Sequence, residues 1–151
     1  MEKNIINLKI KLAFLLLRFF SKFLRLRLPP IPSVSALIEK NDTLLFIKSP
    51  DRLNLPGGVV DEGETLEQAL IREVKEETNL KIEIKKIFGE YPWKNEINGI
   101  NFCYKVKAVS GKLKGSEEGE PVWLKPKEAL KIMENPTRRK IIKDYLKAFE
   151  V

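Results

Sequence analysis

Short apolar runs, of the kind that form β-strands, dominate the chain beyond its first prolines. Two of them, residues 34–39 and 43–48, flank the polar tripeptide Lys40-Asn41-Asp42 and predict a β-hairpin. The next segment, Ser49–Leu53, is expected to be a loop. Pro56-Gly57-Gly58 predicts a turn, because proline fixes φ and glycine permits backbone conformations that other residues avoid.

The spacing of apolar residues becomes helical after this turn. Thr65, with Gln68 three residues later, forms a capping box that places the start of a helix near Leu66. Asn79 stands just past the last turn, at a position that favours a residue tolerant of left-handed geometry. The sequence therefore predicts a helix over residues 66–78. One face of this helix carries its apolar side chains, Leu66, Leu70, Ile71 and Val74.

The rest of the pattern predicts strands followed by two helices. With the hairpin and the central helix, these elements indicate a mixed α/β fold in one domain, residues 33–151, whose size suits a single core. The elements expected after the central helix are strands at 81–88 and 100–109 with a loop at 94–99 between them, a polar loop at 111–119, a strand at 121–124, a helix from Pro126 to about Glu134 that ends at Asn135-Pro136, and a last helix capped by Thr137.

A different pattern occupies residues 1–28, which are rich in apolar and basic residues. They hold seven of the chain's 28 Lys and Arg residues and one of its 21 Asp and Glu residues, a net charge of +6. The other 123 residues carry 21 basic and 20 acidic side chains, a net charge of +1. We therefore expect a basic amphipathic N-terminal helix, joined to the domain by a proline-rich linker at 29–32. On such a helix four basic residues fall within about 60° of one another: Lys11, Arg18, Lys22 and Arg25.

Three roles are open for this N-terminal helix. A narrow basic stripe on an apolar helix is typical of an anchor at a membrane surface. The helix is otherwise expected to cover the domain or form the seam of a homodimer, or to serve as a targeting peptide. A transmembrane span is not expected, because the longest uncharged stretch of its dense apolar part, Leu12–Leu17, falls far short of the roughly 20 residues required.

The composition excludes several kinds of catalytic and metal site. The chain has no histidine, which excludes Ser–His–Asp triads, Cys–His dyads and His-ligated zinc sites. Its one cysteine, Cys103, lies in an apolar strand-like run and is expected to be a buried, inert thiol. Because the region after residue 28 is nearly neutral, no nucleic-acid partner is expected. The protein is predicted to be cytoplasmic, with peripheral contact to a membrane surface through residues 5–28.

Carboxylates are concentrated on the predicted central helix. On a helical wheel Glu73, Glu76 and Glu77 fall within about 100°, beside the apolar face, where their mutual repulsion is costly unless a cation joins them. Glu64 stands at the entrance of the same helix, and Gly57-Gly58 allow a ligand to approach the backbone closely. Hard divalent cations such as Mg²⁺ and Mn²⁺ prefer oxygen ligands of this kind. The alternative is a solvated helix face, paired with the basic residues of the same helix.

The spacing of these residues resembles the Nudix box, the signature of the Nudix hydrolase family. The resemblance covers all 23 positions of the box with one departure, Asn79, where the family usually has glycine. Asparagine is the next best residue for a left-handed helix cap, so we expect the geometry to be kept. The similarity extends over about residues 33–149. The positions that carry it are Gly58, Glu64, Arg72-Glu73-Val74, Glu76-Glu77 and Asn79-Leu80.

The resemblance implies an α/β/α sandwich around a mixed β-sheet. It also implies the hydrolysis of a nucleoside diphosphate linked to a further group X. By position, three glutamates would bind Mg²⁺ or Mn²⁺, with the carbonyl of Gly57 as a further ligand. Arg72 would orient these glutamates by ion pairing, and Glu64 would assist the site. The three expected metal ligands on the helix are Glu73, Glu76 and Glu77.

The general base and the substrate are left open by the resemblance. The base is either Glu73 or an acid of the later polar loop, namely Glu117, Glu118 or Glu120. A nucleoside triphosphate or an ADP-ribose-type compound is the family's usual substrate. Several aromatic and basic side chains either contact the substrate or serve only the core and the surface. They are Tyr91, Trp93, Phe102, Tyr104, Arg52, Lys94 and Lys105.

Two further functions compete with this hydrolase. One is a non-catalytic module that keeps the fold and senses a nucleotide. The other is an enzyme at the membrane surface that acts on a lipid-linked or membrane-proximal diphosphate, in which case the N-terminal helix carries the main function.

Overall fold

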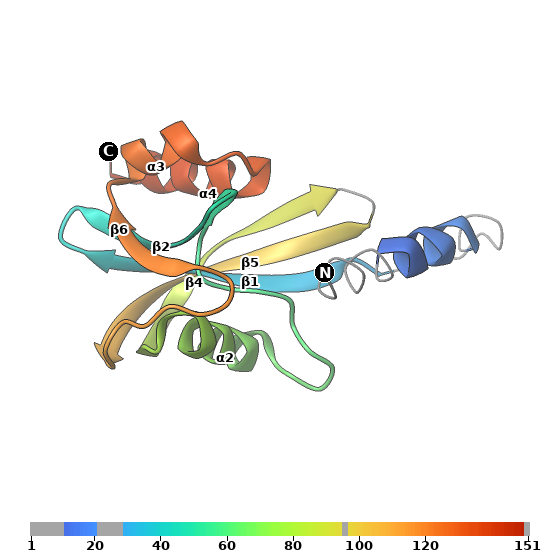
Figure 1. Cartoon of the computed structure of the whole chain (residues 1–151), viewed down its shortest axis with the longest axis horizontal. Coiled ribbons are helices and arrows are strands. Elements are labelled where there is room, and N and C mark those ends of the chain that lie inside the picture. The colour runs from blue at the N-terminus through green and yellow to red at the C-terminus, as the bar shows by residue number, and fades with distance from the viewer. Residues whose placement is uncertain (1–10, 21–28, 95–96, 150–151) are drawn as a thin grey trace.

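The computed structural model describes residues 11–20, 29–94 and 97–149. Residues 11–20 are helical, and the later residues form a mixed α/β domain, as predicted (Figure 1). The elements of that domain are β1 (Ile31–Lys40), β2 (Thr43–Ser49), β3 (Arg52–Asn54), α2 (Leu66–Thr78), β4 (Lys81–Lys94), β5 (Asn98–Ser110), β6 (Glu120–Leu124), α3 (Pro126–Ile132) and α4 (Pro136–Lys147).

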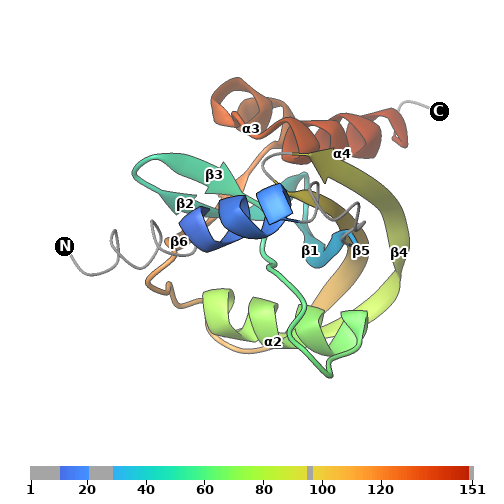
Figure 2. The same ribbon diagram turned by 90° about the vertical axis from the view of Figure 1, so that its right-hand side faces the viewer.

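The strands form one mixed sheet between two layers of helix. Their order is β3-β2-β1-β5-β4, and β6 pairs with β2. β1 and β5 run parallel, whereas the β4–β5, β1–β2, β2–β3 and β2–β6 pairs are antiparallel. α2 covers one face of the sheet, and α3 and α4 cover the other (Figures 1 and 2). The predicted α/β/α sandwich is thereby confirmed.

Alternation along β1 explains why the domain has a core on each face of the sheet. Val34, Ala36 and Ile38 belong to the cluster that packs against α2, and Leu37 belongs to the cluster that packs against α3 and α4. All four side chains are fully buried. Successive side chains of a strand point to opposite faces, so a strand with both faces covered needs apolar residues at odd and even positions alike.

Helix α2 begins and ends as the sequence predicts. The hydroxyl of Thr65 accepts a hydrogen bond from the backbone N–H of Gln68 at 3.1 Å, and the Gln68 side chain accepts one from the Thr65 N–H at 2.9 Å. Asn79 caps the other end in the left-handed conformation, with φ of 62°. Its side-chain amide also donates to the carbonyl of Lys112 at 2.9 Å, a bond that glycine could not make. The helix end is therefore fastened to the loop after β5.

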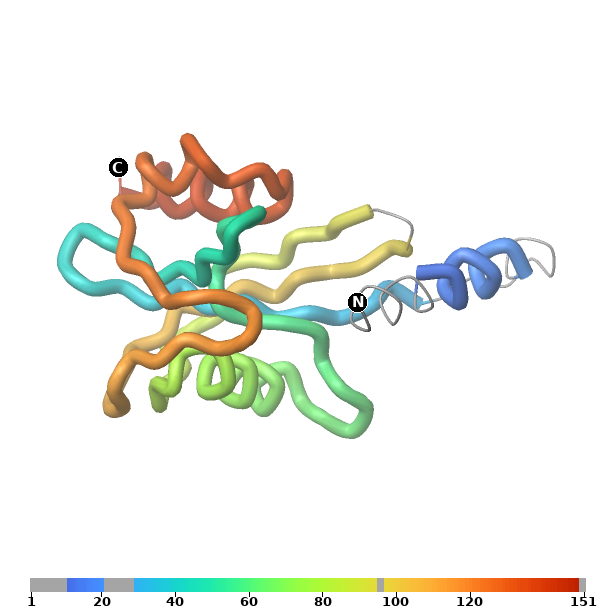
Figure 3. Tube along the Cα trace, in the orientation of Figure 1, coloured from blue at the N-terminus to red at the C-terminus, as the bar shows by residue number. Residues whose placement is uncertain are grey.

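One predicted loop and one predicted turn contain extended backbone that pairs with a neighbouring strand. The end of the predicted loop Ser49–Leu53 belongs to β3, which starts at Arg52 and pairs with β2. The predicted turn at Pro56–Gly58 is a bend at Pro56 followed by an extended segment. This segment lies along β1, because the amides of Val34 and Ala36 donate to the carbonyls of Gly58 and Pro56, both at 2.8 Å. The chain then crosses to the face of the sheet that α2 covers (Figure 3).

The later elements differ from prediction mainly at their ends. β4 continues to Lys94, which pairs with Asn98, so the predicted loop at 94–99 is shorter. Helix α3 ends at Ile132. Asn135, not Thr137, caps α4, because its side chain accepts a hydrogen bond from the backbone N–H of Arg138 at 3.0 Å and Pro136 occupies the first helical position.

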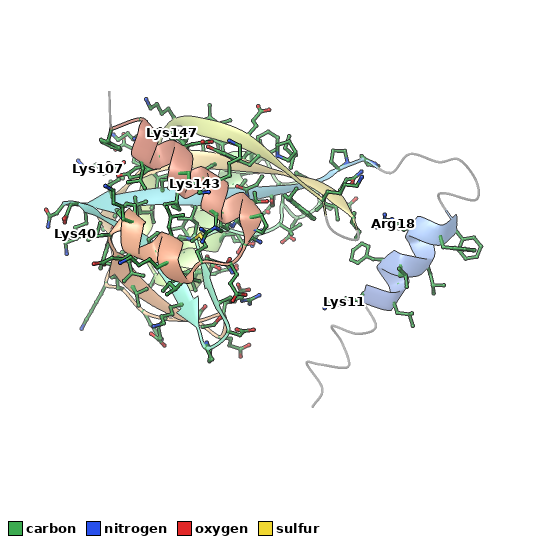
Figure 4. All side chains as sticks on the ribbon, turned by 90° about the horizontal axis from the view of Figure 1, so that it is seen from above. Lys11, Arg18, Lys40, Lys107, Lys143 and Lys147 are labelled. Atoms are coloured by element: carbon green, nitrogen blue, oxygen red, sulfur yellow. The ribbon has the colours of Figure 1, made fainter. Side chains whose placement is uncertain are left out.

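Residues 11–20 form an exposed helix that lies apart from the α/β domain (Figure 4). The helix is therefore not buried against the domain. The other parts of the predicted N-terminal helix, residues 1–10 and 21–28, lie outside the described residues, and β1 already begins at Ile31, within the predicted linker. In the part of the chain that the structure describes, no helix has the length and apolar character needed to span a membrane. The large apolar side chains exposed on this helix are Leu12, Phe14, Leu15, Leu16, Leu17, Phe19 and Phe20.

Candidate metal centre and the adjoining cavity

Two glycines bring the extended segment after β3 between β1 and α2. Gly57 has φ of 144°, and a Cβ there would collide with the carbonyl oxygen of Val34 and lie 2.7 Å from the Cα of Ser35. A Cβ on Gly58 would overlap the carboxylate of Glu73. Because neither glycine carries a side chain, this segment contacts the strand on one side and the carboxylates of the helix on the other.

Glu77 is the carboxylate most closely tied to this segment. Its Oε2 accepts a hydrogen bond from the backbone N–H of Gly57 at 2.7 Å, and the residue is only 4% exposed. The carbonyls of Pro56 and Gly58 accept bonds from β1, and the Gly57 carbonyl takes no part in that ladder. The resemblance to the Nudix box predicted this carbonyl as a further metal ligand, and that role stays a prediction.

Arg72 is the centre of an ion-pair network at the entrance of α2. Its Nε and Nη2 donate to the two oxygens of Glu64 at 2.7 and 2.9 Å. Its Nη1 donates to Glu73 at 2.8 Å and reaches Glu76 at 3.4 Å, and Asp61 lies 3.5 Å from Nη2. The predicted ion pairing of Arg72 with the glutamates of the box is therefore present in the structure. The hydrogen bonds from Arg72 lower the pKa of Glu64 to about 2.

The buried carboxylates lack sufficient positive charge around them. Burial, together with the hydrogen bond and charge of Glu118, raises the pKa of Glu77 to about 8, although the Gly57 amide opposes the rise. Burial also raises the pKa of Glu73, against the effect of Arg72, and Glu76 and Glu118 add to the increase by repulsion. Desolvation and like-charge repulsion both disfavour the ionised form, and a nearby cation would reverse both effects.

The donor set suits a hard divalent cation, but the carboxylates are not gathered into a complete site. Among the described residues, no three His, Cys, Asp or Glu side chains are close enough together to hold a metal ion. Arg72 draws Glu73 and Glu76 toward itself, and the Gly57 amide holds Glu77. Oxygen donors of this kind, buried with raised pKa values, match the preference of Mg²⁺ and Mn²⁺ for carboxylate and carbonyl oxygens.

The acids of the later loop do not all face this centre. Glu118 interacts with Glu77 and with Glu73, as their pKa shifts record. The carboxylate of Glu120 instead lies over Gly115, where a Cβ would overlap it. Glu120 is one of the three later acids that the sequence offered as catalytic, and that role stays a prediction.

A cavity of about 660 Å³ adjoins the centre on the side of Gly58 and Val59. Arg52 and Lys94, which the sequence left open as substrate contacts or surface residues, line it together with Trp93. Lys105 does not line it and pairs with Glu39 at 3.3 Å. Tyr91 and Tyr104 are buried in the two core clusters, and Phe102 packs against the cluster on the α2 side, which favours a structural role for these three aromatic residues.

The cavity also contains residues that the sequence reading missed. Asn101 of β5 is 1% exposed, and its side chain joins Ser33 and Ser35 of β1 through hydrogen bonds of 3.1 and 2.7 Å. Arg138 of α4 lines the cavity as well, and its Nη1 is buried without a hydrogen-bond partner. These residues come from three elements that are far apart in the sequence, so no local pattern could have grouped them.

Cys103 is buried, as predicted. Burial raises the pKa of its thiol to about 11, which makes the thiolate scarce at neutral pH. The thiol is therefore expected to be chemically inert.

Comparison with known proteins matches this chain to one family. The model of the NUDIX domain matches residues 29–145. An ADP-ribose pyrophosphatase of Methanocaldococcus jannaschii is 33% identical over 135 residues, covering 82% of this chain and 77% of that protein. A MutT-like protein of Streptomyces ambofaciens is 36% identical over 107 residues, covering 66% and 68%. An NAD-capped RNA hydrolase of Photobacterium profundum is 28% identical, and the match spans 75% of this chain but 44% of that protein.

Solved structures share the fold. A NUDIX hydrolase from Nitrosomonas europaea superposes with a TM-score of 0.70 at 25% identity, covering 80% of this chain and 90% of the other. A MutT protein from Methanosarcina mazei Go1 gives a TM-score of 0.67 at 24% identity, covering 82% and 97%.

Proposed function

This chain belongs to the Nudix hydrolase family, and from that premise we propose that it is a metal-dependent diphosphatase cleaving a nucleoside diphosphate linked to a group X. One observation carries the proposal. Glu73 and Glu77 are held against the extended segment at Gly57 and Gly58, beside a cavity large enough for part of a nucleotide. The pKa values of both carboxylates are raised, and a bound cation would lower them by favouring the ionised forms.

Mg²⁺ or Mn²⁺ would be held by the carboxylates of Glu73, Glu76 and Glu77 and by the carbonyl of Gly57. When bound, such an ion neutralises diphosphate charge, polarises its oxygens and makes water a stronger nucleophile at neutral pH.

The side chains around this site have separate tasks in the proposal. Arg72 positions Glu73 through its bond of 2.8 Å, and Glu64 in turn fixes the orientation of Arg72. Glu73 is the proposed general base, which accepts the proton of the attacking water. Glu118 is the loop acid best supported as an alternative base, because its charge acts on Glu77, and Glu117 and Glu120 are the other candidates from that region.

The substrate is proposed by class. The name of the Methanocaldococcus relative favours an ADP-ribose-type compound, and nucleoside triphosphates form the second class. The name of the Photobacterium relative adds an NAD cap on RNA to the compounds that should be tested.

A panel of nucleoside triphosphates, ADP-ribose, UDP-sugars and NAD, incubated with Mg²⁺ or Mn²⁺ and followed by mass spectrometry, tests the proposal. We expect cleavage between two phosphates for at least one class. Glu76→Gln and Glu77→Gln should each lower the rate by about 100-fold or more, because each loses a metal ligand. Glu90→Gln on β4, an exposed residue, is the matched control. Turnover that both Glu76 and Glu77 variants retain would exclude the proposed site.

The same panel separates this enzyme from a nucleotide sensor. A non-catalytic module would bind a nucleotide in a calorimetric titration and yield no product with either metal. Catalytic turnover by the wild-type protein would exclude that alternative.

We also propose that residues 11–20 bind the surface of an anionic membrane, which would bring the enzyme near membrane-proximal diphosphates. Seven large apolar side chains on this helix are each 38–69% exposed. Lys11 and Arg18 lie on the same helix (Figure 4). The sequence places five further basic residues within residues 1–28. Apolar insertion combined with positive charge favours anionic lipid headgroups.

Co-sedimentation with vesicles of anionic or zwitterionic lipid tests this contact. The wild-type chain should sediment with anionic vesicles, and binding should weaken with salt because exposed charges are screened. A double variant, Leu15→Glu with Phe19→Glu, should stay in solution. Val109→Glu, which removes an exposed apolar residue from β5, is the control. A vesicle-independent dimer that the double variant abolishes would instead assign the helix to a homodimer seam.

A further inference from the structure

Arg138 brings an unsatisfied hydrogen-bond donor to the wall of the cavity. Its Nη1 is buried and has no hydrogen-bond partner among the described residues. A guanidinium stays protonated in proteins, so a buried guanidinium nitrogen without a hydrogen-bond partner destabilises the folded state. The backbone N–H of the same residue is used by Asn135, so the position of Arg138 at the start of α4 is fixed.

The neighbours of Arg138 make the cavity suitable for an acceptor group. Among the described residues that line it, three are cations, Arg52, Lys94 and Arg138, and none is acidic. Asn101 and Ser33 form its polar floor, and they are already bonded to each other at 3.1 Å. Arg138 lines the same cavity as Gly58, whose backbone lies against the carboxylate of Glu73, so the cavity joins it to the candidate metal centre.

We propose that Arg138 binds an acceptor oxygen of the group that lies beyond the scissile diphosphate, and thereby selects the substrate. This inference rests on the proposed diphosphatase function, since it assigns the neighbouring cavity to the rest of the same substrate. Two sources supply such an oxygen: a further phosphate, and a carbonyl on the edge of a purine base. Arginine binds both, through charge-assisted bonds to phosphate and through bonds to O6 of a guanine-type base.

Small probes separate the two sources without requiring hydrolysis or metal. Inosine and adenosine differ at C6, where inosine has a carbonyl oxygen and adenosine an amino group. Ribose 5-phosphate offers a phosphate and no base. NMR titration of the full chain should show that inosine or ribose 5-phosphate binds at least about 10-fold more tightly than adenosine, which is the discrimination expected of one good arginine contact. Equal binding of all three probes would overturn the proposal.

Variants at position 138 connect the preference to this side chain. Arg138→Met should abolish the preference, and Arg138→Lys, which keeps the charge but loses the planar fork, should retain only part of it. Lys143→Gln on the same helix is the matched control. An Arg138→Met variant that keeps the wild-type preference would contradict the proposal.

Thermal unfolding distinguishes this role from a structural one. Because Arg138→Met removes a buried charge without a partner, its Tm should be unchanged or higher by about 2–4 °C. A Tm lowered by both Arg138→Met and Arg138→Lys would show that Arg138 supports the fold, and would overturn the proposal. If the wild-type chain hydrolyses no diphosphate yet shows the probe preference, the proposed function fails and the assignment of Arg138 stands.

Discussion

Arg72 and Glu64 are joined by two parallel hydrogen bonds, Nε to Oε1 at 2.7 Å and Nη2 to Oε2 at 2.9 Å. The two residues are eight positions apart, so the fork fastens the entrance of α2 to its middle. The remaining nitrogen, Nη1, is thereby aimed at Glu73. Arg72 thus acts as a brace, because a planar guanidinium held on one edge by Glu64 fixes the carboxylate on its other edge.

Replacing this brace should impair catalysis more than binding. Arg72→Lys keeps the positive charge but cannot form the fork, so Glu73 loses its fixed position. We expect kcat to fall by about 100-fold, as small misplacements of catalytic groups do, with a smaller change in KM. Steady-state kinetics on the best substrate measures both. Lys140→Gln, which removes an exposed ion pair with Asp144 on α4, is the control. Wild-type kcat in Arg72→Lys would contradict the bracing role.

The same ion pair should make stability depend on acid pH. The bonds from Arg72 lower the pKa of Glu64 from an ordinary 4.5 to about 2 in the folded protein. A lowered pKa contributes stability that is fully present above the unfolded value and is lost as pH falls from about 4.5 through about 2. The difference in Tm between the wild-type chain and Glu64→Gln should therefore be constant above about pH 5.5 and shrink below it. Glu62→Gln, an exposed neighbour, should follow the wild-type pH dependence of Tm. A difference at pH 2.5 as large as the one above pH 5.5 would contradict this ion-pair contribution.

Local signals account for the parts of the fold that the sequence predicted well. The capping box of Thr65 and Gln68 and the left-handed Asn79 depend on neighbours within one turn, and the structure confirms both ends of α2. The start of α4 shows the limit of such signals. Asn135 and Thr137 are both capping residues, and Pro136 decides between them, because it suits the first position inside a helix.

Long-range pairing accounts for what the sequence did not predict. The segment after Pro56 is extended because amides of β1 donate to it, and nothing in its own residues indicates that partner. The cavity wall likewise depends on β1, β5 and α4 meeting at Ser33, Asn101 and Arg138. The box motif predicted the carboxylates of α2, but it could not rank the acids of the later loop, whose placement depends on how that loop folds back.

The loop acids should differ in their effect on the reaction. Glu118 interacts with Glu77, whereas the carboxylate of Glu120 lies over Gly115. We therefore expect Glu118→Gln to lower kcat more than Glu120→Gln does, by a further factor of at least about 10. A positioned acid or base can contribute an effect of this size. Rates measured from pH 6 to 9 for both variants and for Glu73→Gln test this order. A larger loss in Glu120→Gln would contradict this order.

Gly57 should tolerate no side chain, and Gly63 provides the comparison. Both have positive φ, 144° and 83°, so alanine is strained at either position. At Gly63 no atom lies within 4 Å of the added Cβ, and the cost should be only the left-handed strain of about 1–2 kcal/mol. At Gly57 the Cβ would collide with the backbone of Val34 and Ser35, which cannot move without disrupting β1.

The two alanine variants should therefore separate clearly in thermal unfolding. Gly63→Ala should lower Tm by a few degrees, about 2–4 °C per kcal/mol for a domain of this size. Gly57→Ala should lower it by more than about 10 °C or prevent folding, since backbone displacement adds to the strain. Circular dichroism melts of both variants give the comparison. Equal Tm values would mean that the extended segment can move away from β1, and the contact between Gly57 and Glu77 would then not depend on this packing.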